Sequence, residues 1–211
     1  MDTEPSPLVP PAPAPEYEIH TRLRLLEAAV QIFDRKGYAA ASVREIAEAA
    51  GVTKPVLYYH FGSKEGLLLA VLTQAMHDFQ IVLDAGLART GAARERLLQL
   101  CEDIYRMFEK HVPVVRVAHA VFLGPRDLAP KFDMLVFERR LREAVVRIVT
   151  DGQQAGELRR APAEDAALAI MGILEGATDR QMLPNLSQVG TDGLRRILNV
   201  LFEGLAVETS S

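Results

Sequence analysis

The stretch ASVREIAEAAGVTKPVLYYHFGSKEGLL, residues 41–68, decides how this chain folds. Ser42 and Glu45 have the spacing of a capping box, in which each side chain accepts a hydrogen bond from the other residue's backbone amide. Gly51 interrupts the helical pattern and can adopt the positive φ of a tight turn without steric cost. The sequence therefore predicts a short helix that begins at Ser42 and stops at Gly51.

A second short helix is predicted directly after this turn. Thr53 is a favourable N-cap residue, and Pro55 falls at the second helical position. Its missing N–H costs nothing there, because first-turn amides have no intrahelical acceptor. Ser63 caps a longer helix that follows. Two short helices joined by Gly51 and Val52 indicate helix-turn-helix geometry.

The second short helix has more hydrogen-bond donors than a core or an ordinary solvated face requires. We expect Val52, Leu57 and Phe61 to anchor it. The side chains left to point outward are Thr53, Lys54, Tyr58, Tyr59 and His60. Such donors, together with helix N-terminal amides, suit the phosphates and base edges of DNA. The alternatives are tyrosines at the edge of the core and a structural histidine.

Residues 41–68 closely resemble the DNA-binding signature of the tetracycline-repressor (TetR) family of transcription regulators, and the resemblance extends over about residues 17–72. It implies an all-α protein of about nine helices, with a three-helix DNA-binding head and a larger helical body that binds a ligand and forms a homodimer. The positions that match DNA-facing positions of the family are Ser42, Arg44, Thr53, Lys54, Pro55, Tyr58, Tyr59, His60 and Lys64. Arg44 is alternatively an ordinary surface arginine, and Val56 either packs or reads a thymine methyl group.

The rest of the chain reads as one tail and two domains. Residues 1–16 are proline-rich and are expected to be disordered, residues 17–64 form the head, and residues 65–211 form the body. The first helix has Leu23, Leu26, Val30 and Phe33 on one face. Later periodic helices cover about residues 92–110, 113–123, 128–155, 163–183 and 191–207. No segment alternates with the period of a strand.

Composition limits location and chemistry. One cysteine, no signal peptide and no apolar run near the roughly 20 residues of a membrane span predict a cytoplasmic protein. The net charge of −4 permits DNA binding, because only the docking surface must be positive. We find no Gly-rich phosphate loop, no H-E-x-x-H and no Cys/His cluster. We therefore expect no enzyme activity, metal or cofactor; a helical protein–protein adaptor is the remaining rival.

The helices of the body predict two further sites. Aromatic, methionine and polar interruptions predict a cavity for a small, mostly apolar ligand. Its candidates are Tyr105, Phe108, His119, Phe122, Phe137, Met171, Glu175 and Thr178, with Met107, Arg116, Met134 and Glu138 beside them. Apolar stripes near the C-terminus predict a four-helix dimer interface through Leu168, Leu194, Leu198, Leu201, Phe202 and Leu205. Alternatively, both stripes are buried within one subunit. A homodimer would place two heads on a palindromic operator.

Overall fold

The computed structural model describes residues 16–122, 132–133, 135–183 and 185–204, and these ranges contain nine helices and no strand. The helices are α1 (Glu16–Lys36), α2 (Val43–Ala49), α3 (Lys54–Phe61), α4 (Lys64–Ala88), α5 (Ala93–Lys110), α6 (Val112–Phe122), α7 (Leu135–Gln154), α8 (Ala163–Met182) and α9 (Gly190–Glu203). The all-α prediction is confirmed. Nearly all of the expected tail, Met134 and Leu205 lie outside the described residues.

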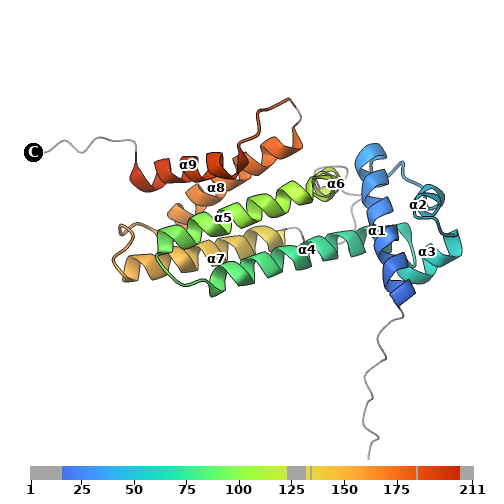
Figure 1. Cartoon of the computed structure of the whole chain (residues 1–211), viewed down its shortest axis with the longest axis horizontal. Coiled ribbons are helices and arrows are strands. Elements are labelled where there is room, and N and C mark those ends of the chain that lie inside the picture. The colour runs from blue at the N-terminus through green and yellow to red at the C-terminus, as the bar shows by residue number, and fades with distance from the viewer. Residues whose placement is uncertain (1–15, 123–131, 134, 184, 205–211) are drawn as a thin grey trace, which may run out of the picture.

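Helices α1, α2 and α3 form a head at one end of the molecule, and α4 runs from this head along the body (Figure 1). The head has its own core, to which α1, α2, α3, α4 and α6 all contribute. Leu57 of α3 and Ile46 of α2 are fully buried in it. Because α6 also contributes to this core, the head is packed against the body through more than the α4 connection.

The local signals in residues 41–68 act as predicted, with one exception. Ser42 and Glu45 form the full capping box, and Ser63 Oγ accepts a hydrogen bond from the Gly66 amide at 2.9 Å. Gly51 has φ +66° in the turn, and Val52 N donates to Ala47 O at 2.9 Å to close it. Thr53 occupies the N-cap position of α3, but its side chain makes no capping hydrogen bond.

Two expectations about helix faces and bounds are wrong. Leu23 is 45% exposed, because the buried face of α1 instead runs through residues such as Leu25, Ala29 and Ile32. Helix α7 begins at Leu135 and not near residue 128. The Asp133 carboxylate accepts a hydrogen bond from Leu135 N at 3.1 Å, so Asp133 satisfies a first-turn amide at the start of α7.

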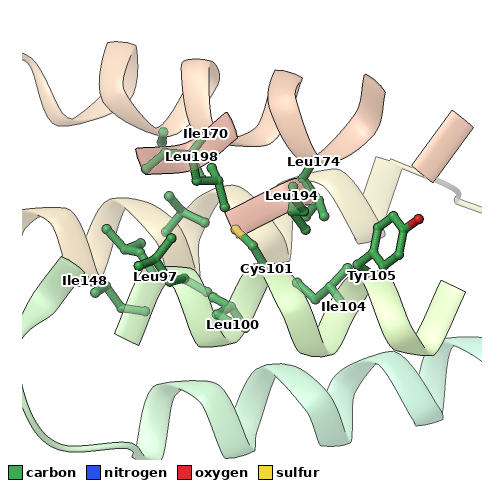
Figure 2. Close-up of a cluster of buried hydrophobic side chains, with 14 of the residues drawn as sticks. Leu97, Leu100, Cys101, Ile104, Tyr105, Ile148, Ile170, Leu174, Leu194 and Leu198 are labelled. Carbon is green, nitrogen blue, oxygen red and sulfur yellow. The ribbon is translucent and has the colours of Figure 1, made fainter. Parts of the chain in front are cut away.

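The core of the body surrounds α5. Figure 2 shows Leu97, Cys101 and Ile104 of α5 beside Leu194 and Leu198 of α9. Helices α4, α7 and α8 complete this cluster. The burial of Cys101 raises the pKa of its thiol to about 12.

Helix α4 belongs to both cores. Leu67 and Leu68 near its start lie in the head cluster, whereas Phe79 and Leu83 lie in the body cluster. By length and composition alone, α4 is apolar enough to cross a membrane. Core helices of soluble proteins pass the same test of length and composition. Helix α4 contributes buried side chains to both cores.

Candidate DNA-binding surface and ligand cavity

The outward face of α3 has the side chains predicted for DNA contact. Thr53, Lys54, Pro55, Tyr58 and Tyr59 are exposed, and Tyr59 is exposed by 74%. A core-edge role is excluded for a tyrosine with that exposure. His60, half-buried, lies with its ring 5.2 Å from the Tyr59 ring in an edge arrangement.

The N-terminus of α3 can take an anion. Because Thr53 does not cap the helix, its hydroxyl does not compete for the first-turn amides. Within the described ranges, no carboxylate lies at ion-pair distance from Lys54. The first turn of α3 contains no acidic residue. The Val56 and Leu57 amides donate to the Thr53 carbonyl oxygen and Pro55 has no N–H, so the helix dipole and the ammonium group of Lys54 are what favour a phosphate at this end.

The predicted contacts at the start of α2 are exposed but already have partners. Ser42 Oγ lies 3.2 Å from the Glu45 amide, and Arg44 Nε donates to Glu48 Oε1 at 2.7 Å. The Lys36 ammonium and the two Ser42 donors lower the pKa of the Glu45 carboxyl to about 2. If Arg44 contacts DNA, its guanidinium must therefore either leave Glu48 or bind Glu48 and a phosphate at the same time.

Lys64 is not free, contrary to what we expected. Its ammonium donates to the carbonyl oxygens of Tyr38 and Ala41, both at 2.9 Å, and of Ala39 at 3.3 Å. It also lies 4.6 Å from the centroid of the Tyr38 ring. In this structure Lys64 therefore fastens the first turn of α4 to the α1–α2 loop, and its three donors are used within the protein.

Two arginines of α1 lie beside α3 and were missed from the sequence. The Arg22 guanidinium lies over the Phe61 ring, 5.6 Å from its centroid, near the end of α3. The Arg24 guanidinium lies beside the turn, 3.8 Å from where a β-carbon on Gly51 would be. Both side chains are exposed. Only the packing of α1 across the other two helices reveals that they flank α3.

The second site is a cavity of about 1180 Å³ between the head and the body. Six helices supply its walls: α1, α4, α5, α6, α7 and α8. Phe33, Asp34 and Gly37, at and just beyond the end of α1, line it opposite residues of α6. The cavity therefore reaches the head itself, which the sequence did not indicate.

The structure brings most of the predicted ligand residues to this cavity. Its walls include Phe108, His119, Phe122, Phe137, Met171, Glu175 and Thr178, together with Met107, Arg116 and Glu138. Tyr105 is an exception and the prediction for it is wrong. It is buried in the body core, where its hydroxyl accepts a hydrogen bond from Gly190 N at 3.0 Å.

The predicted interface residues divide into two groups. Leu194 and Leu198 are fully buried within the subunit, so they cannot form an interface, and Phe202 packs against the same core. Leu168 and Leu201 are exposed, by 72% and 38%, and Ile197 and Val200 are exposed beside Leu201. We call Leu168, Ile197, Val200 and Leu201 the α8–α9 face. The helical spacing of apolar residues in the sequence does not by itself tell the buried face of α9 from its exposed apolar face.

Gly172 and Gly176 of α8 lie at exposed positions. A β-carbon on either glycine would meet nothing within 4 Å. Small residues of this kind allow the backbone of a second helix to approach closely.

A helix-turn-helix head with an outward-facing polar helix, joined to a helical body with a large cavity, defines a DNA-binding regulator class. Comparison with known proteins agrees. Residues 25–71 match the model of the bacterial regulatory proteins of the tetR family. The chain is 42% identical over 88 residues to the HTH-type transcriptional activator FasR of Mycolicibacterium smegmatis, and the match covers 42% of this chain and 40% of FasR.

Two further proteins are similar over most of the chain. The HTH-type transcriptional repressor DhaR of a Mycobacterium species is 27% identical over 193 residues, which are 90% of this chain and 94% of DhaR. The crystal structure of the TetR family regulator PfmR from Thermus thermophilus superposes with a TM-score of 0.72 at 26% identity, and covers 87% of this chain and all of PfmR. The head of this chain therefore matches the tetR family model, and the chain as a whole is similar in fold to a TetR family transcription regulator.

Proposed function

We propose that this protein is a cytoplasmic homodimeric repressor that leaves a palindromic operator when a small, mostly apolar molecule fills the cavity. The observation that carries the proposal is the cavity itself, because one wall belongs to the head that is proposed to grip DNA. The relatives named activator and repressor share this type of head. A ligand-dependent activator is therefore the alternative, and reporter expression with and without the gene decides between them.

The coupling between cavity and head has a physical route. Arg116 of α6 binds the Asp34 carboxylate of α1 through two hydrogen bonds, at 2.7 and 2.5 Å, and both residues line the cavity. A ligand that binds better when α1 and α6 are displaced shifts the population toward that arrangement. The two heads of the dimer would then no longer match successive major grooves.

Lys54→Ala should weaken binding to the protein's own promoter DNA about tenfold with little change in thermal midpoint. Lys54 is exposed, so its loss removes a phosphate contact and no packing. Fluorescence anisotropy across a salt series measures both the affinity and its salt dependence. The slope of log affinity against log salt should fall by about one.

The matched control is Arg160→Ala, which removes an exposed cation from the α7–α8 connection, at the end of the body away from the head (Figure 1). It should bind the same DNA as wild type does. Equal loss in both variants would mean that overall charge, and not α3, governs binding. Absence of DNA binding by the wild-type protein even at low salt would reject the proposed function.

Leu168→Arg should convert the protein to a monomer at micromolar concentration. A charge on the α8–α9 face would be buried without a partner on assembly, whereas the exposed Leu168 is not needed in the monomer. Sedimentation velocity measures the change. Ile81→Arg, at an isoleucine of α4 that is 55% exposed, is the control and should stay dimeric. A dimeric Leu168→Arg protein would place the interface elsewhere.

A further inference from the structure

The described cavity walls combine aromatic rings with more acidic than basic side chains. Phe79, Phe108, Phe122 and Phe137 reach it from four different helices, and the Phe79 and Phe137 rings lie 5.1 Å apart. Such walls suit a flat or bulky apolar body. Rings also present a negative face to a cation. The aromatic lining is thus compatible with a neutral or a positively charged ligand.

The charges select between these two. Among the residues that the structure describes, four carboxylates line the cavity, those of Asp34, Glu138, Glu175 and Asp179, against a single guanidinium. That guanidinium, of Arg116, is already bound by Asp34 through both carboxylate oxygens. The charges of Arg116 and Asp34 cancel each other. Among the described lining residues, the carboxylates of Glu138, Glu175 and Asp179 remain.

The remaining carboxylates are not equally available. Glu138 lies 3.8 Å from Arg142 Nε, and Arg142 is held more closely by Glu164 at 2.9 Å. For Glu175 and Asp179, one turn apart on α8, no cationic side chain lies within ion-pair distance in the described part of the chain. His111 and His119 also line the cavity and add positive charge only when protonated. His111 Nε2 faces the Asp78 carboxylate at 3.8 Å.

We infer that the ligand of this cavity is an amphipathic organic cation, with an aromatic or aliphatic body and an amine or quaternary onium group placed near Glu175 and Asp179. This rests on the proposed function, because it names the chemical class of the proposed ligand. The apolar body fills the aromatic part of the cavity, and the cation meets the two carboxylates. A fatty acid or other lipid anion would bring its own carboxylate beside three others, two of which are exposed, and these like charges repel it at low ionic strength.

Tetraphenylphosphonium and tetraphenylborate test the charge directly, because the two ions have nearly the same size and shape and opposite charge. Titration calorimetry on the full-length protein at low salt should show phosphonium binding at least about tenfold tighter than borate. Glu175→Gln combined with Asp179→Asn should remove about tenfold of phosphonium affinity. Asp165→Asn, which removes an exposed carboxylate from the first turn of α8 away from the cavity, should leave it unchanged.

The outcomes separate this inference from the proposed function. Borate binding as tightly as phosphonium, or a double variant with wild-type affinity for phosphonium, would overturn the cation assignment while leaving a ligand-regulated repressor intact. Binding of neither ion to a protein that still binds promoter DNA would overturn the cation assignment as well. Failure of the proposed function would instead appear as absence of DNA binding by the wild-type protein, which anisotropy measures separately.

Discussion

Gly66→Ala should lower DNA affinity by at least a hundredfold and reduce the free energy of unfolding by about 3 kcal/mol. A β-carbon at Gly66 would overlap the Phe61 carbonyl, because the first turn of α4 is packed directly on the last turn of α3. A backbone carbonyl cannot rotate away as a side chain can. The whole of α3 must therefore tilt, and its outward face would no longer fit the groove.

Chemical denaturation and promoter-DNA anisotropy measure the two effects of this substitution. Glu65→Ala is the control, since Glu65 is the exposed neighbour in the same helical turn. It should change stability by no more than about 0.5 kcal/mol. A Gly66→Ala protein with wild-type affinity for DNA would show that the angle between α3 and α4 is not fixed by this contact.

Lys64→Met should reduce the free energy of unfolding by about 2 kcal/mol, because three carbonyl oxygens of the α1–α2 loop lose a charged donor together. Methionine keeps most of the volume of the side chain, so packing changes little. DNA affinity should fall as well, since the loop leads directly into Ser42 and α2. The thermal midpoint and the anisotropy salt series report both changes.

The salt series separates a positioning role from a direct DNA contact. If Lys64 acts through the loop, the salt slope of Lys64→Met should stay that of wild type. Lys64→Arg should recover part of the stability, since a guanidinium can also donate to carbonyls. A slope lower by about one with an unchanged thermal midpoint would instead place Lys64 on a phosphate, as the sequence resemblance implies.

Short-range signals account for the parts of the fold that were predicted correctly. The capping box, Gly51 and Pro55 each act within one helical turn, so their effect can be read without knowing what packs on them. The start of α7 was predicted too early. It is set by Asp133, which accepts a hydrogen bond from Leu135 N, and no pattern of apolar residues next to Asp133 marks this position. The wall that α1 gives to the cavity depends on how distant helices cross, which sequence period does not encode.

The site predictions follow the same division. Exposure of Thr53, Lys54, Tyr58 and Tyr59 was predictable, because the anchors of α3 fix which face remains outward. Lys64 was misjudged because its acceptors are backbone carbonyls more than twenty residues earlier, which carry no side-chain signature. Leu194 and Leu198 were assigned to an interface because an apolar stripe does not say which neighbour covers it.

Cys101 is the single cysteine of the chain, and it is fully buried with a thiol pKa of about 12. Its thiolate, the reactive form, is therefore scarce at neutral pH. A second cysteine introduced at an exposed site of the head can consequently carry a spin label or a fluorophore while the native one stays unmodified. In a dimer, the distance between two such labels reports the separation of the heads directly, with and without a bound ligand.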